Sequence, residues 1–118
     1  MSAFGRLHPQ FKPWADYFME VARYNGIRPR VTSTTRSCSN QRRLYERYRR
    51  GESIYPAAPP GRSLHNIGMA FDVAGTPEEL RALGHWWESL GFFWGGRVND
   101  PIHFAVARRL PPGEWCLT

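Results

Sequence analysis

Two histidines and two aspartates lie in two short segments whose residue types suit metal-assisted hydrolysis. In the first segment, SLHNIGMAFD, His65 and Asp72 are seven positions apart, and in the second, DPIHF, Asp100 lies three positions before His103. Two imidazoles and one carboxylate are a common ligand set for catalytic zinc, with the fourth position left to water. Zinc acidifies that water and polarises a carbonyl, and a further carboxylate must then carry the proton to the leaving amine. The two segments therefore form a candidate Zn2+ site in which Asp100 can supply the base.

Each of these residues alone has an ordinary structural interpretation. A single histidine near an apolar strand usually belongs to the core or the surface, and a single aspartate after a strand usually ends a turn or caps a helix. Gly68 can be a turn glycine, or it can join Ala70 as a small residue that lets the backbone pass close to a metal. His8 and His85 fall in no ligand pattern. Only the combination of the two segments indicates a metal site.

The two segments resemble the paired motif of the LAS metallopeptidases. The residues at the spacing of that motif are Ser63, His65, Gly68, Ala70 and Asp72, followed by Asp100 and His103. The family includes D-alanyl-D-alanine carboxypeptidases and dipeptidases, phage L-alanyl-D-glutamate endopeptidases and the related hedgehog signalling domain. Residues 32–45 are similar to the family's upstream strand, arginine and helix, and residues 90–96 to its phage-lysin and small carboxypeptidase branch. The resemblance covers about residues 10–107.

The resemblance implies a role for each member of the motif. His65, Asp72 and His103 would bind Zn2+, and Asp100 would be the general base. Many relatives carry glutamate at the position of the base, although the phage-lysin branch carries aspartate as this chain does. The short connection between Asp72 and His103 leaves little room for a substrate-binding insertion.

Two further residues gain a role only through the resemblance. Arg36 would hold the scissile carbonyl as it becomes an oxyanion, or hold a carboxylate of the substrate. A permanently charged, fork-shaped guanidinium suits either task. Ser63 would donate or accept a hydrogen bond with the substrate or with a metal ligand.

The implied function is that of a zinc-dependent peptidase acting on the stem peptides of peptidoglycan. An endolysin-type L-alanyl-D-glutamate endopeptidase is the favoured interpretation, as in phage or prophage lysins. The alternative within the same class is a D-alanyl-D-alanine carboxypeptidase, for which Arg36 could grip the terminal carboxylate. A catalytically inactive, zinc-containing cell-wall-binding module is a third hypothesis, and the presence of Asp100 and Arg36 argues against it.

The elements that must position these residues follow from periodicity and from start and stop signals. The expected elements are helix 13–24, strand 29–35, a helix capped by Ser39 and running to Arg50, loop 53–62, strand 69–73, a helix capped by Thr76 and ending at Gly91, turn 94–96 and strand 102–107. Few short strands among helices predict a small α+β domain with an antiparallel sheet and flanking helices, of the LAS or hedgehog type. We expect one peptidase domain over residues 1–118.

Composition and charge limit the other classes of function. The chain has 118 residues, of which 42% are hydrophobic, so it can form one folded core. Its formal net charge of +6 favours anionic partners, including an acidic envelope polymer. Residues 41–50 interleave arginines with aromatic side chains, which could suit nucleic acid. However, Leu44, Tyr45 and Tyr48 have helical spacing and are expected to form a buried stripe, so no specific nucleic acid is predicted.

The chain also carries features that bear on its location. No apolar run approaches the roughly 20 residues of a membrane span, and residues 1–6 do not resemble a secretory signal. We expect a monomer made in the cytoplasm that acts on the wall after export or release. Cys38 and Cys116 are too far apart in sequence to form a metal motif, and two free thiols are expected unless the fold brings them together.

Overall fold

The computed structural model describes residues 4–116 as a four-stranded antiparallel sheet with three helices, which confirms the expected fold class. The elements are α1 (Lys12–Tyr24), β1 (Arg30–Ser33), α2 (Cys38–Arg49), the 3-10 turn η1 (Leu64–Ile67), β2 (Ala70–Ala74), α3 (Pro77–Ser89), β3 (Phe93–Trp94), the 3-10 turn η2 (Gly95–Val98) and β4 (His103–Ala105). The strand order is β1-β2-β4-β3. No helix in the described part of the chain is long and apolar enough to cross a membrane.

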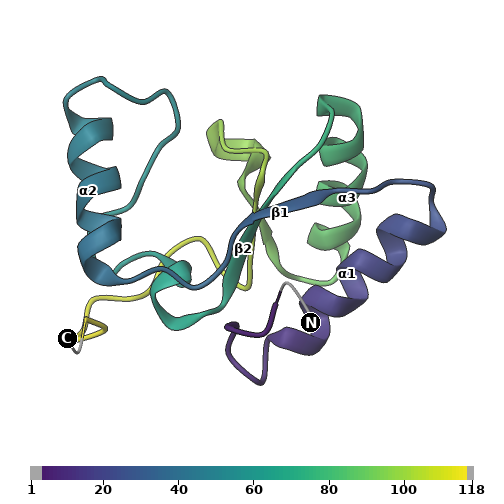
Figure 1. The fold of residues 1–118 in the computed structure, drawn as a ribbon, viewed down its shortest axis with the longest axis horizontal. Helices are drawn as coiled ribbons and strands as arrows, with labels where there is room; N and C mark the ends of the chain where they lie inside the picture. Colours follow the sequence, from purple (N-terminus) through teal and green to yellow (C-terminus); the bar gives the residue numbers. More distant parts are fainter. Residues whose placement is uncertain (1–3, 117–118) are drawn as a thin grey trace.

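The sheet has one face that packs on helices and one face that carries polar side chains. Phe71 of β2 lies opposite Phe104 of β4, and both are fully buried beneath α1 and α3. Figure 1 shows α1 and α3 together on one side of the sheet, with α2 on the other side. Because neighbouring residues of a strand face opposite ways, Asp72 and its partner His103 point away from this core.

The helices begin where the sequence predicts, with one exception. Thr76 and Glu79 form a reciprocal capping box at the start of α3, as expected. At α2 the prediction of Ser39 as the cap is wrong, because the Ser37 hydroxyl accepts the hydrogen bond from the Asn40 backbone N–H. The two-residue strand β3 is not among the expected elements, and its second residue, Trp94, falls in the predicted turn 94–96.

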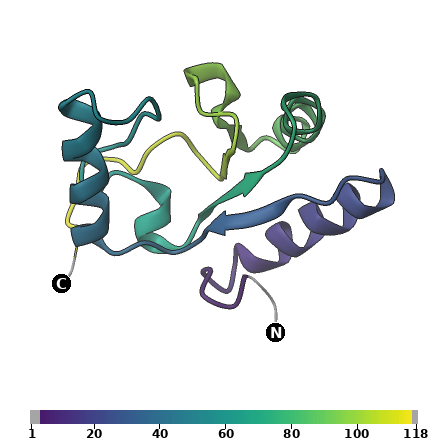
Figure 2. The same cartoon turned by 45° about the horizontal axis from the view of Figure 1, so that its top comes forward.

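Helix α2 differs from the amphipathic core helix that its sequence predicts. Within the described residues it contributes nothing to either hydrophobic cluster, and Gln41 is its one buried residue. Leu44 is only half-buried and Tyr48 is exposed, so the expected buried stripe is wrong. Both views of the fold show α2 set apart from α1 and α3 (Figures 1 and 2). Helix α2 is thus a wall of a cleft rather than part of the core.

A disulfide bond ties the N-terminal end of α2 to the C-terminal segment. Cys38 and Cys116 are joined across 78 residues of sequence, with Cα atoms 5.8 Å apart. The expectation of two free thiols is therefore wrong, because the fold returns the end of the chain to the foot of α2, as Figure 2 shows. The disulfide therefore fixes one end of a helix that has no residue in the hydrophobic clusters of the described chain.

Reduction of this disulfide should lower the free energy of unfolding by about 2–5 kcal/mol, because the cross-link closes a long loop in the unfolded chain. The measurement is urea unfolding with and without a thiol reductant. The chain has only two cysteines, so the reductant can act on this bond alone. A double Cys38→Ser/Cys116→Ser variant should be less stable and indifferent to the reductant. Equal unfolding midpoints for the oxidised and reduced wild type would contradict a stabilising role.

Candidate metal centre and active site

The register of the sheet brings three polar side chains to the face opposite the core. Asp72 pairs with His103 on β4 and with Ser33 on β1. The β1–β2 pairing contains a bulge, since Val31 pairs with Val73 while Ser33, two positions on, pairs with Asp72. An extra residue in one strand shifts the direction of the next side chain. The bulge therefore turns Ser33 to the side of Asp72 and His103.

The η1 turn holds His65 beside β2. The Ser63 hydroxyl caps this turn by accepting a 3.2 Å hydrogen bond from the His65 backbone N–H. The His65 Nδ1 atom lies 2.6 Å from the Thr34 backbone oxygen. The turn ends at Gly68, whose φ of 73° suits glycine. A Cβ there would come within 2.8 Å of the His8 backbone nitrogen, so Gly68 packs on the N-terminal segment. Of the two interpretations of Gly68, the turn glycine is therefore correct, and the close approach to a metal is not.

Three ligand atoms converge in this centre. The His65 Nε2 and His103 Nδ1 atoms each lie 3.1 Å from the Asp72 Oδ1 atom. One ligand atom from each of the three residues falls within 4.8 Å of the others, so the cluster could hold a metal ion.

The hydrogen bond to Thr34 determines which nitrogen of His65 carries the proton, and therefore whether the cluster requires a cation. A neutral imidazole has one N–H, and His65 donates it from Nδ1 to the Thr34 carbonyl. Its Nε2 lone pair then faces the lone pairs of a carboxylate, an arrangement that requires a cation or an added proton between them. Burial lowers the pKa of His65, although its contacts with Asp72 act in the opposite direction, so the added proton is disfavoured. The donor set therefore fits a metal cation.

Asp72 is ionised despite being buried. Burial by itself raises the pKa of this carboxyl, but its close contacts with His103 and His65 outweigh burial and hold the pKa far below its usual range. A permanently negative oxygen between two imidazoles is the environment that a divalent cation favours.

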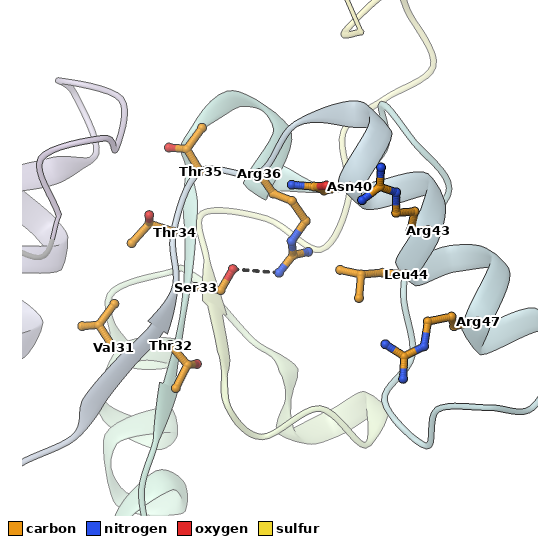
Figure 3. A pocket seen from close by; sticks show the side chains of 10 residues that line it. All are labelled: Val31, Thr32, Ser33, Thr34, Thr35, Arg36, Asn40, Arg43, Leu44 and Arg47. Carbon is orange, nitrogen blue, oxygen red and sulfur yellow. Dashed lines mark hydrogen bonds between the residues drawn. The ribbon is translucent and has the colours of Figure 1, made fainter.

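Arg36 is fixed beside the cluster by three side chains. Its Nη1 atom donates a 2.8 Å hydrogen bond to Gln41, and its Nη2 atom donates bonds of 2.8 Å to Ser33 and 3.4 Å to Asp72. Figure 3 shows the guanidinium between β1 and α2, with the bond to Ser33. Gln41 is itself held by a 2.8 Å bond to the Ala58 carbonyl. Burial lowers the pKa of Arg36, and its usual value is so high that the group stays charged.

Asp100 reaches the same site from the turn after β3. The Asp100 backbone N–H donates to the Gly95 carbonyl at 2.9 Å, and the Trp94 indole donates to the Pro101 carbonyl at 2.8 Å. A Cβ on Gly95 would meet the Asp100 carbonyl oxygen at 2.2 Å, so only glycine allows this approach. Burial raises the pKa of Asp100 to about 6. A carboxyl with a pKa near neutrality can both accept and return a proton.

These residues line one cleft of about 840 Å³. One wall is α2, another is the segment that carries Asp100, and residues 52–58 form part of the rim. The residues expected from the sequence that line it are Arg36, Ser63, His65, Asp72, Asp100 and His103. All six candidate residues therefore lie in the same cleft, although they come from separate elements.

The comparison with protein families fits this geometry. Residues 5–93 match the family described as VanY, D-alanyl-D-alanine carboxypeptidase. The chain belongs to this family. Membership confirms the expected class of enzyme, a zinc metallopeptidase of the cell wall, and the VanY description agrees with the carboxypeptidase alternative rather than with the endolysin interpretation.

Solved VanY structures share the fold. One is a mutant of a vancomycin-resistance D,D-pentapeptidase VanY from a VanB-type resistance cassette in complex with Zn(II), with 21% identity, a TM-score of 0.69, and coverage of 90% of this chain and 75% of that one. Another is VanYB in complex with D-alanine-D-alanine, with 19% identity, a TM-score of 0.67, and coverage of 85% and 71%. Comparison with curated proteins gave no match.

Three parts of the site were not predicted from the sequence. Ser33 and Gln41 hold Arg36, and residues 52–58 form the rim of the cleft. The role of Gln41 is visible only in the fold, where its buried amide in a largely exposed helix needs hydrogen-bond partners. His8 and His85 lie outside the cleft, as expected. His85 packs edge-on against Trp94 instead.

Proposed function

We propose that the chain is a zinc-dependent D-alanyl-D-alanine carboxypeptidase that removes the terminal D-alanine of peptidoglycan stem peptides. The observation that carries the proposal is the convergence of ligand atoms of His65, Asp72 and His103, in which the His65 Nε2 lone pair faces the Asp72 carboxylate and needs a cation between them. Family membership supports the choice of bond. The Zn(II) and the D-alanine-D-alanine in the VanY neighbours support the metal and the substrate.

The residues of the site divide the work of hydrolysis. When bound by His65, Asp72 and His103, zinc supplies Lewis acidity that activates water and polarises the scissile carbonyl. Asp100 takes the proton from the attacking water and returns it to the leaving amine, as a carboxyl with a pKa of about 6 can do. Burial of Asp100 and Arg36 in the cleft keeps both groups in a low-dielectric setting, where their interactions with substrate are strong.

Arg36 retains donors for a substrate oxygen. Three of its five N–H groups are used by Gln41, Ser33 and Asp72, so two remain without a partner in the described residues. They can hold the carbonyl oxygen as it gains charge, or the terminal carboxylate that distinguishes a carboxypeptidase substrate from an internal bond. Ser63 lies in the same cleft, but its hydroxyl already accepts from the His65 backbone. Its first role is to fix a metal ligand.

We also propose that the protein acts outside the reducing cytoplasm. The support is the Cys38–Cys116 disulfide, because such bonds persist in oxidising compartments such as the bacterial periplasm and the cell surface. The basic surface suits an acidic envelope polymer.

Digestion of purified peptidoglycan and of a soluble stem pentapeptide, with and without a chelator, tests the function. We expect release of free D-alanine that stops with the chelator and returns with zinc. New N-terminal D-glutamate or isoglutamine would instead establish the endolysin-type endopeptidase. Binding to the wall with no product of either kind would favour the inactive binding module.

Arg36→Lys should lose most activity while keeping the fold and the metal. An ammonium has the same charge but cannot donate to Gln41, Ser33, Asp72 and a substrate at once. Loss of a donor to a developing oxyanion costs about 2.7–4 kcal/mol in the barrier, or roughly 100- to 1,000-fold in kcat. The measurement is D-alanine release together with zinc content. Arg23→Lys, on the exposed surface of α1, is the matched control and should behave as wild type.

A further inference from the structure

A second groove adjoins the catalytic cleft between β1 and α2. It has a volume of about 720 Å³ and shares Arg36, Leu44 and Arg47 with the cleft, so the two form a continuous surface. Figure 3 shows Leu44 and Arg47 pointing from α2 into this space toward β1, with Arg43 nearby. The function described above assigns no role to this groove.

The groove is strongly basic. Three arginines line it, Arg36, Arg43 and Arg47, and none of its lining residues is acidic. Arg43 and Arg47 are four positions apart on α2, which places two like charges on one helix face at a cost in stability. Arg43 has no hydrogen bond or ion pair in residues 4–116, whereas Arg50 and Arg97 each pair with a glutamate. An anion in the groove would relieve this repulsion.

The groove also offers a backbone edge. β1 is the first strand in the sheet order, so its outer edge pairs with no other strand of the described sheet. An extended peptide can pair with such an edge by main-chain hydrogen bonds. Ser33 of β1 lines this groove, and its partner in the β1–β2 pairing is Asp72 of the metal centre. A peptide lying along β1 would therefore lead directly into the catalytic cleft.

We propose that this groove binds the part of the stem peptide that precedes the scissile bond, and that Arg43 and Arg47 hold a free carboxylate of that part. This inference rests on the proposed function. A stem peptide has such a group, the α-carboxylate of its γ-linked D-glutamate. This residue lies two positions before the D-alanine whose carbonyl is attacked. At about 3.5 Å per residue, that carboxylate lies roughly 7–10 Å from the bond that is cut, which calls for a groove next to the cleft and not within it.

Two matched pentapeptides test the proposal, one with D-glutamate and one with neutral D-isoglutamine at the second position. Wild-type kcat/KM should be about tenfold higher for the acidic peptide, the value of one charge-assisted hydrogen bond of moderate strength. The preference should shrink as salt is raised. The double variant Arg43→Gln/Arg47→Gln should lose this preference. Its kcat/KM for the acidic peptide should fall, whereas its kcat/KM for the neutral peptide should change little.

Arg42→Gln is the matched control, because it removes the same charge from an exposed position of α2 that lines neither cavity. It should keep the preference. Equal cleavage of both peptides by wild type, or a preference that survives in the double variant, would overturn the inference while leaving the proposed function intact. No D-alanine release from either peptide would overturn the proposed function itself. Oligonucleotide binding lost in the double variant, without any peptide preference, would assign the groove to nucleic acid.

Discussion

Asp100→Asn is expected to lower kcat for D-alanine release by roughly 100- to 10,000-fold, the usual effect of losing a general base, while zinc content and fold stay as in wild type. The carboxyl lies in the cleft beside Arg36 and His103 but is not one of the three converging ligands. Asparagine has nearly the same shape as aspartate, and its backbone N–H can still donate to the Gly95 carbonyl. Its side-chain amide, however, cannot accept a proton. The residual activity reflects the groups that still polarise the carbonyl.

The pH profile separates this role from a structural one. Asp100 must be deprotonated to act as a base, so wild-type activity should fall as the pH drops through the pKa of this group. Burial raises that pKa to about 6, and a nearby bound cation lowers it, so the acid limb should lie at or below pH 6. With zinc kept saturating, Asp100→Asn should lose this limb. A variant with wild-type turnover, or with the same acid limb, would show that another group is the base.

The sequence predicts what local chemistry determines. The capping box of α3 needs only Thr76 and Glu79, and the short apolar run that forms β2 needs only its own residues. Strand β3 has two residues and owes its pairing to β4, so no local pattern could reveal it. The disulfide depends on a return of the chain over 78 residues, which sequence spacing cannot show. Helix α2 has an amphipathic sequence, but its half-buried face lines a cleft instead of the core.

The same distinction holds within the site. The types and spacing of the four motif residues were enough to group them, because each has an ordinary structural explanation alone but together they match the paired motif of a known metallopeptidase family and a common zinc ligand set. The residues that orient Arg36 were not predictable, since a serine and a glutamine are common everywhere and gain meaning only from their contacts. The bulge that turns Ser33 toward Asp72 is a property of strand pairing, and it decides which side chains reach the metal centre.

Asp72→Asn should remove zinc from the protein and abolish activity with it. The carboxylate lies 3.1 Å from a nitrogen of each imidazole and holds its charge despite burial, so it supplies the negative oxygen of the proposed ligand set. An amide is neutral and leaves two histidines alone to bind the ion. We expect zinc affinity to fall by more than about 100-fold, the upper range for losing an outer-shell partner. Elemental analysis after dialysis against a weak chelator measures this loss.

Excess zinc distinguishes the two aspartates in a single experiment. Added zinc should restore part of the activity of Asp72→Asn, because the base and Arg36 are still in place, but it should not restore Asp100→Asn, which is already loaded. Asp16→Asn, the same change at a half-buried carboxylate of α1 that pairs with Lys12 and does not line the cleft, controls for the loss of one negative charge. Retention of zinc by Asp72→Asn together with its loss from Asp100→Asn would reverse the two assignments. If folded wild-type protein takes up no zinc, then His65, Asp72 and His103 do not form a zinc site, and the proposed metal centre is refuted.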